Sequence, residues 1–373
     1  MGTSKCATCG GGLKKNGTTS AGRTRWRCKD CGASQVGRID NTAKRLEMFL
    51  DWLLSRKRQA DMPGAGRTFR RKCSVFWQIW PMPPKIEEAR QVVFVDGIHL
   101  GRRAVVLIAS DEKHALGWYV CRQENSRAWA ALLARIAAPQ VVVSDGGPGF
   151  AKVLRQAWPT TRHQRCVFHA FSQVRKYTTS RPRTQAGVEL YGLAKALLAV
   201  RSLEQASSWV ENLFAWSLKW ETFLAQTTIR ADGTRALTHE RLVKAQKSLE
   251  RLIKTNTLFT YLDPQLCAQK PLPATNNQIE GSANARLRQM LRDHRGLSTK
   301  RRLKAIFLWC YQHSPNPLPA AQILRVMPTD QSITNIYQQL NTRQQLQNSI
   351  PTWGDAIAWA ELHHNTPYTQ IWD

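Results

Sequence analysis

The sequence predicts an α/β protein whose central sheet is interrupted by an all-α segment and preceded by two small N-terminal modules. Three observations predict this fold class. Two Cys-x-x-Cys pairs open the chain, valine-rich strands begin at residue 91, and residues 181–271 show helical spacing. A chain of 373 residues is long enough for roughly two or three compact units.

The charge of the chain indicates a polyanionic partner. The formal net charge is +28. A ribosomal or chromatin protein can be equally basic, but such proteins seldom have 14 tryptophans and so much apolar β-sequence. Nucleic acid is the commonest cellular polyanion. The sequence has no signal-peptide segment or long apolar run, and five of its nine cysteines are scattered, so we expect an intracellular protein with no membrane partner.

Residues 1–37 are predicted to form a zinc ribbon. Glycines follow both cysteine pairs and can adopt the positive φ that a tight metal knuckle needs. Asn-Gly and Ala-Gly turns separate short strand-like pieces. So short a polar segment cannot bury a core without metal, which predicts one structural Zn²⁺. Its four tetrahedral ligands are Cys6, Cys9, Cys28 and Cys31.

Residues 40–82 are predicted to form a helix-turn-helix DNA-binding module. Residues 42–59 have helical spacing, a Gly/Pro turn follows, and a second short helix over 67–81 ends at Pro81. The alternative is a basic helical hairpin that only connects domains. The apolar face of the first helix comprises Leu46, Phe49, Leu50, Leu53 and Leu54, and the basic residues of the second are Arg67, Arg70, Arg71 and Lys72.

The next segment, 90–180, is predicted to carry the first part of an RNase H-like sheet. Its expected elements are strands 91–100, 102–110 and 116–121, a helix over 126–137 and a strand over 140–150. The first and fourth strands end in Asp96 and Asp145. Each aspartate alone could be a turn residue, but the pair in this strand order predicts two carboxylates in the crevice beyond the sheet.

A third acid is expected on a helix over residues 273–291. Thr275 and Gln278 have the spacing of a capping box. Glu280 lies beside an apolar stripe of Ile279, Ala283, Leu287 and Met290.

Four motifs in this order resemble those of a bacterial insertion-sequence transposase of the Mutator-like DDE class, the branch with an N-terminal zinc ribbon. They are VVFVDG with Asp96, VVVSDGG with Asp145, RCVFHA with Cys166 and His169, and TNNQIEGSANARLR with Glu280. The resemblance covers nearly the whole chain. It implies an enzyme that binds the terminal inverted repeats of its element and catalyses Mg²⁺-dependent DNA cleavage and strand transfer.

The resemblance also implies the cofactors, partners and domain order. Two Mg²⁺ ions, replaceable by Mn²⁺, would be bridged by Asp96, while Asp145 and Glu280 would each favour one ion. Double-stranded DNA, as element ends and target, would be the partner of a homodimer or higher homo-oligomer in the bacterial cytoplasm, at the nucleoid. An all-α insertion over 181–271 would split the catalytic domain, which resumes over 272–313 with the glutamate helix.

Two further features of the sequence have more than one interpretation. Cys166 and His169 could form a plain strand-to-helix join, or, as the resemblance implies, lie by the active site and orient DNA or the attacking group. The basic stretch after Glu280 could be a solvated helix face, but we expect a phosphate track. It comprises Arg286, Arg288, Arg292, Arg301 and Arg302, with Arg295, Lys300 and Lys304. Residues 314–373 are expected to be a helical tail without an assigned function.

Two rival functions remain. A metal-dependent nuclease on the same fold would cut without joining, but it needs no module that reads specific DNA ends. A DNA-binding regulator derived from a transposase would have no use for three clustered acids.

Overall fold

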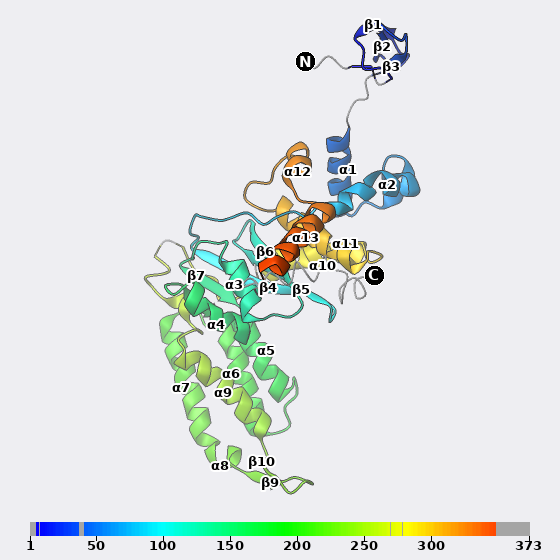
Figure 1. The fold of residues 1–373 in the computed structure, drawn as a ribbon. Helices are drawn as coiled ribbons and strands as arrows, with labels where there is room; N and C mark the ends of the chain where they lie inside the picture. The colour runs from blue at the N-terminus through cyan, green and yellow to red at the C-terminus, as the bar shows by residue number, and fades with distance from the viewer. Residues whose placement is uncertain (1–4, 7, 37–40, 269, 278, 348–373) are drawn as a thin grey trace.

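The computed structural model describes the chain except residues 1–4, 7, 37–40, 269, 278 and 348–373 (Figure 1). Within the helices, the backbone alone is described at Ala65, Ile279, Glu280, Ser282 and residues 341–347.

The N-terminal ribbon is a three-stranded antiparallel sheet. Its strands are β1 (Leu13–Thr18), β2 (Thr24–Cys28) and β3 (Ser34–Val36), in the order β1-β2-β3. The Ala-Gly turn is confirmed, because Gly22 has a φ of +72° and its N–H donates to the Thr19 carbonyl. The Asn-Gly turn is wrong. Gly17 lies inside β1, at a register irregularity that bends the strand instead of reversing it.

Two helices follow the ribbon, α1 (Thr42–Leu54) and α2 (Ala65–Cys73), with short 3₁₀ turns at Gln59–Asp61 and Ser74–Gln78. The predicted apolar face of α1 is buried except for the half-buried Leu54. The second helix ends at Cys73 and not at Pro81, because Phe76 and Trp80 turn into the core. Helix α1 also packs against α11 and α12 from the far end of the chain (Figure 1).

A five-stranded mixed sheet forms the centre of the molecule, in the order β6-β5-β4-β7-β8. Strands β4, β5 and β6 pair antiparallel, whereas β4, β7 and β8 pair parallel. The predicted bounds of β4, 91–100, agree with the structure, but Asp96 lies inside the strand and not at its end. Strand β7 is shorter than the predicted 140–150 and ends at Ser144, where a glycine-rich turn begins. The strands are β4 (Val92–Leu100), β5 (Ala104–Ser110), β6 (Ala115–Cys121), β7 (Val141–Ser144) and β8 (Arg162–Arg165).

Helices cover both faces of this sheet. Alternate residues of β4 show why its sequence is apolar throughout: Val93 and Val95 enter one cluster, and Phe94 and Ile98 enter the other. The first cluster lies under α3 (Ser126–Leu133) and α4 (Pro148–Ala157). The second is shared with α5 (Val167–Thr178) and α11 (Thr299–Gln312).

The predicted insertion is helical but not all-α. It contains α6 (Gln185–Ala196), a 3₁₀ turn (Leu197–Ala199), α7 (Leu203–Lys219), α8 (Glu221–Leu224), α9 (Glu240–Lys254) and a 3₁₀ turn (Thr260–Leu262). A hairpin of β9 (Thr227–Ile229) and β10 (Arg235–Leu237) joins α8 to α9. Figure 1 shows α5, α6, α7 and α9 side by side, extending away from the sheet.

After the insertion the chain returns to the sheet. A π-helix (Ile279–Asn284) leads into α10 (Ala285–Asp293), and α11 is followed by α12 (Ala320–Val326) and α13 (Asp330–Gln347). Ala283, Leu287 and Met290 are buried as predicted, although the helix begins at Ile279 and not near residue 273. Among the described residues, no helix is both long and apolar enough to span a membrane.

Candidate active site and nucleic-acid interface

The carboxyl ends of four strands lie at one edge of the sheet, because β4, β6, β7 and β8 run in the same direction. Asp145 directly follows β7, and Cys166 directly follows β8. The last residues of these two strands, Ser144 and Arg165, pair with each other. Asp96 lies on β4 two residues beyond Phe94, where the pairing with β7 ends. The structure thus places all three residues at the same edge.

Backbone and side-chain donors orient both aspartates, which are half-buried. Oδ1 of Asp96 accepts a hydrogen bond of 2.8 Å from the Gly97 N–H, and Oδ2 accepts one from Asn284 Nδ2. Oδ1 of Asp145 accepts a hydrogen bond of 3.1 Å from the Gly147 N–H. Charged carboxylates with such donors keep their orientation without a bound ion.

Glu124 is a carboxylate at this edge that the sequence analysis missed. Its Oε1 lies 3.0 Å from Nε2 of His99, and a Cβ added at Gly97 would lie 2.2 Å from the same oxygen. Burial, together with the negative charge of Asp145, raises the pKa of Glu124. Glu124 lies three residues after the end of β6, whereas Asp145 directly follows β7, so no pattern at the strand end singled it out.

Arg165 supplies a positive charge beside Asp145. A Cβ at Gly146 would lie 2.6 Å from the Arg165 side chain, so the guanidinium stem crosses the turn that follows Asp145. Burial lowers the pKa of Arg165, and Asp145 opposes that shift. Its Nη1 is buried and has no hydrogen-bond partner among the described residues.

Cys166 joins three parts of the chain at the sheet edge. Its N–H donates to the Ser144 carbonyl at 2.8 Å, and its buried Sγ accepts from the Asn276 N–H at 3.2 Å. The Val167 N–H donates to the Ala274 carbonyl at 3.0 Å. His169 follows on the first turn of α5, where it is partly exposed.

The backbone of Glu280 lies in the π-helix, which packs against β4, but its side chain is outside what the structure describes. Gln278 is also outside the described residues, so the capping box is untested. Two asparagines that the sequence analysis did not single out bind β4 on either side of Glu280. Asn276 Nδ2 donates to the Val95 carbonyl at 3.1 Å, and Asn284 donates to Asp96.

The four N-terminal cysteines could bind a zinc ion. Their sulfur atoms all lie within 4.8 Å of one another, with Cys6–Cys31 and Cys9–Cys28 separations of 3.6 and 3.5 Å. Ligands about 2.3 Å from one tetrahedral ion would have sulfurs roughly 3.8 Å apart, which fits this cluster.

The knuckle backbone also fits a metal site. Gly10 and Gly32 have φ values of +76° and +72°, as predicted. N–H groups of Cys9 and Thr8 lower the pKa of the Cys6 thiol to about 6, which favours the thiolate that binds metal.

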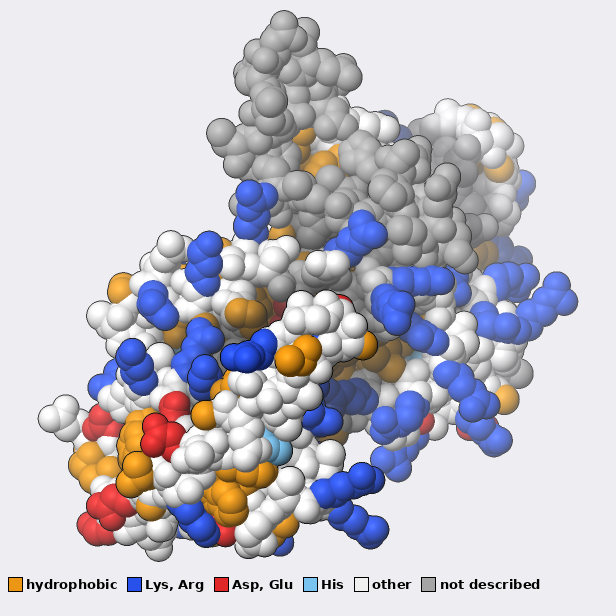
Figure 2. Space-filling view, turned by 90° about the horizontal axis from the view of Figure 1, so that it is seen from below, with side chains coloured by type: hydrophobic (Ala, Val, Ile, Leu, Met, Phe, Trp, Pro, Cys, Tyr) orange, Lys and Arg blue, Asp and Glu red, His pale blue; other side chains and the backbone are white. Residues whose placement is uncertain are grey.

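The basic residues named from the sequence lie mainly on the surface. Arg302 is half-buried, with Nη2 donating to the Arg295 carbonyl at 2.6 Å. Lys304 is 1% exposed and cannot contact phosphate, so its place in the predicted track is wrong. On the face shown in Figure 2, Lys and Arg side chains are widely spread, whereas most of the Asp and Glu side chains lie at one end. The exposed predicted residues are Arg67, Arg70, Arg71, Lys72, Arg286, Arg288, Arg292 and Arg301.

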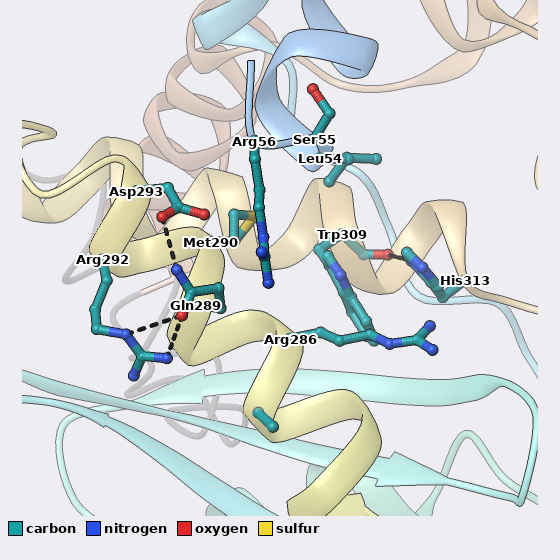
Figure 3. Close-up of a pocket in the computed structure, with 11 residues that line it drawn as sticks. Leu54, Ser55, Arg56, Arg286, Gln289, Met290, Arg292, Asp293, Trp309 and His313 are labelled. Carbon is teal, nitrogen blue, oxygen red and sulfur yellow. Dashed lines mark hydrogen bonds between the residues drawn. The ribbon is translucent and has the colours of Figure 1, made fainter. Parts of the chain in front are cut away.

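A basic pocket of about 460 Å³ lies between the end of α1 and helices α10 and α11 (Figure 3). Arg56, Arg286 and Arg292 line it. Trp309 and His313 stack with ring centroids 3.9 Å apart at the same pocket. The sequence analysis did not identify Arg56, because it reaches the pocket only through the packing of α1 on the C-terminal helices.

The comparisons with known proteins agree on one family. The model of the transposases of the Mutator family matches residues 89–289, more than half of the chain. The transposase for insertion sequence element IS905 of Lactococcus lactis subsp. lactis is 26% identical over 152 residues, which cover 36% of this chain and 38% of that protein.

Two other relatives match similar lengths. The transposase for insertion sequence element IS6120 of Mycolicibacterium smegmatis is 30% identical over 133 residues, covering 30% of this chain and 41% of that protein. A probable insertion-sequence transposase of Corynebacterium diphtheriae is 24% identical over 166 residues, covering 38% of this chain and 48% of that protein. The chain therefore spans less than half the length of each relative.

Proposed function

Because the chain belongs to the Mutator family of transposases, we propose that it is a DDE transposase that binds the terminal inverted repeats of its element and cleaves and joins DNA. One observation carries the proposal: Asp96 and Asp145 share the carboxyl edge of the sheet inside the matched region, with the Glu280 segment bound across it. The strand order supports the RNase H-like fold that this chemistry uses.

The donor set fits magnesium. Asp96 and Asp145 offer hard carboxylate oxygens at a half-buried edge, and Glu280 is proposed as the third ligand. Mg²⁺ bound there would activate an attacking oxygen and stabilise the leaving oxygen of a phosphodiester. The protein holds the ligands in place: the Gly97 and Gly147 N–H groups and Asn284 orient the carboxylates.

Other groups at the edge have proposed roles that follow from their exposure. The buried Cys166 thiol accepts a backbone hydrogen bond, which supports a structural role. His169 is partly exposed at the same edge, and we assign it to orienting DNA or the attacking hydroxyl. The half-buried guanidinium of Arg165 balances Asp145 and can contact a phosphate.

DNA ends would be read by the zinc ribbon (1–37) and a helix-turn-helix module (40–82). The surface arginines of α10, with Arg56 and Arg286 in the pocket of Figure 3, would contact the phosphates. Since an insertion sequence has two ends, we propose that a homodimer or higher homo-oligomer binds its double-stranded DNA, in the bacterial cytoplasm. The catalytic domain would comprise 90–180 and 272–313, split by the insertion over 181–271 and followed by the tail over 314–373.

Carboxylate substitutions test the chemistry. Asp96→Asn, Asp145→Asn and Glu280→Gln should each reduce Mg²⁺-dependent cleavage and strand transfer by more than the roughly 10²–10⁴-fold typical of losing a general acid or base. Gel-shift binding to DNA carrying the element ends should remain. Asp293→Asn, on the exposed last turn of α10, is the control and should retain activity.

Four results would contradict the proposal or redirect it. Near-normal strand transfer by Asp145→Asn would remove the basis of the site. If Asp293→Asn lost strand transfer and Glu280→Gln did not, the assignment of Glu280 as the third carboxylate would be wrong. Wild-type cleavage without joined products would support the nuclease, and specific binding without cleavage would support the regulator.

A further inference from the structure

We propose that Asn284 is a positioning residue of the cation site: it fixes the Asp96 carboxylate and, with Asn276, holds the Glu280 segment against β4. This inference rests on the proposed function, because it concerns the same site.

The first observation is that Asp96 is held at both oxygens. Oδ1 accepts from the Gly97 N–H, and Oδ2 accepts from the amide nitrogen of Asn284, which is 0% exposed. Two donors on opposite oxygens fix the rotation of a carboxylate. An ionised carboxylate has about four lone-pair sites, so these two donors do not by themselves prevent it from binding a cation.

The second observation is that the segment 276–284, which includes the π-helix, is attached to β4 at two points. Asn276, also 0% exposed, donates to the carbonyl of Val95, and its backbone N–H donates to the Cys166 sulfur. Asn284 donates to Asp96, the next residue of the same strand. Glu280 is four residues from each asparagine, so both attachments restrict where its carboxylate can lie. Single π-turns of this kind are frequent at functional sites.

The third observation is an unsatisfied oxygen. Oδ1 of Asn284 is buried and has no hydrogen-bond partner among the described residues. An ionised carboxylate only accepts hydrogen bonds, so the amide nitrogen must face Asp96 and the oxygen must face elsewhere. A buried acceptor without a partner costs free energy, and a hydrated divalent cation held by Asp96 would supply a partner.

The chemistry explains why an amide suits this position. An acid at 284 would place a second negative charge against Asp96 and would raise the pKa of the pair. An apolar residue would remove the hydrogen bond that Asn284 donates to Oδ2 of Asp96. An asparagine therefore orients the carboxylate without adding charge to the site.

The experiment measures Mn²⁺ binding to the full chain without DNA, by titration calorimetry, for the wild type, Asn284→Ala and Asn284→Leu. Leu has the same number of side-chain heavy atoms and the same branching as Asn and lacks the donor, so it fills the space that Ala would leave empty if the Ala variant fails to fold. Both variants should bind Mn²⁺ about 10–100-fold more weakly, as is usual when a group that orients a metal ligand is removed. Raising the Mn²⁺ concentration should recover part of their strand-transfer activity.

Asn277→Ala is the matched control, since Asn277 is exposed in the same segment, and its Mn²⁺ affinity should remain within about twofold of wild type. The inference is overturned if a folded Asn284→Ala or Asn284→Leu chain binds Mn²⁺ as tightly as wild type while Asp96→Asn does not. If Asp96→Asn also binds Mn²⁺ normally, the proposed cation site itself is wrong. The Asp96→Asn result therefore distinguishes failure of the proposed function from failure of this inference alone.

Discussion

At the scale of single residues, Glu124 brings a third described carboxylate to the edge that holds Asp96 and Asp145. Its oxygen occupies the space that a side chain at position 97 would need, so the glycine after Asp96 lets Glu124 approach. The negative charge of Asp145 repels an ionised Glu124, and the neighbouring His99 offsets part of this repulsion.

This repulsion predicts a pH-dependent effect of Glu124→Gln. The raised pKa of Glu124 means that its contribution to stability is complete below the pKa of the unfolded chain and is lost as pH rises through the folded pKa. In metal-free buffer the variant should therefore unfold at a higher temperature than wild type at about pH 7.5, and the difference should shrink toward pH 4.

Thermal unfolding across that pH range measures the effect, with Glu211→Gln on the exposed face of α7 as control. A Glu124→Gln variant less stable than wild type at neutral pH would show that the His99 contact outweighs the repulsion.

The residues that could be predicted from the sequence are those with a local pattern. The four cysteines with their glycines, and Asp145 after a run of valines, are recognisable within ten residues of chain. Asn284 and Glu124 acquire their positions from segments far apart in the sequence, because Asn284 meets Asp96 188 positions away. No local pattern marks such a contact.

At the scale of elements, the ribbon depends on its metal. Of the strand residues, Cys28 alone is buried, and the strands carry mostly exposed polar side chains. Such a sheet has too little apolar area to fold without a crosslink, and four thiolates around one ion supply it.

Cys28→Ser should therefore remove about one zinc ion per chain and unfold the ribbon. Metal analysis of the purified protein and proteolysis of the N-terminal region measure the two effects. Cys267→Ser is the matched control, because its thiol donates to the Tyr261 carbonyl, a bond that a hydroxyl can keep. Full zinc content in Cys28→Ser would rule out the four-cysteine site.

Elements with one dominant period were predicted well, and those decided by tertiary packing were not. Strands β4, β5 and β6 were predicted within two residues, since they are apolar on both faces, whereas β8, with the polar sequence RHQR, was not predicted. On α7, Leu203, Phe214 and Leu218 are exposed although they follow the helical spacing. Trp209 and Trp216 are buried, and their indole N–H groups donate to carbonyls of α6.

At the scale of the whole molecule, the chain closes on itself around a buried ion pair. Lys304 of α11 donates to the Trp77 carbonyl and to Asp330 at the start of α13, at 2.5 and 2.7 Å. Trp80 donates to the same carboxylate at 2.6 Å. The N-terminal helices are thereby fixed to the C-terminal ones, a contact of segments 250 positions apart that the order of motifs could not predict.

This ion pair predicts how stability changes at alkaline pH. Burial lowers the pKa of Lys304 to about 8, more than its hydrogen bond to Asp330 raises it. Burial acts to raise the pKa of Asp330, but the hydrogen bond and charge of Lys304, together with Trp80 and Lys300, outweigh it, so that pKa is lowered. The pair is therefore held together by strong attraction, yet the lysine is still easier to deprotonate in the folded chain than in the unfolded one.

Between about pH 8 and pH 10.5 the unfolded chain then binds more protons at Lys304 than the folded chain does, so this residue contributes increasing stability as pH rises. Over this pH range the free energy of unfolding of the wild type should rise relative to that of Lys304→Met. The rise should be on the order of 1.4 kcal/mol for each unit by which the fold lowers the pKa of Lys304. Urea unfolding of both proteins from pH 7.5 to 10.5 measures the difference, in which other titrating groups cancel. A difference that stays flat, or that moves against the wild type, would show that the attraction of Asp330 exceeds the cost of burying the charge.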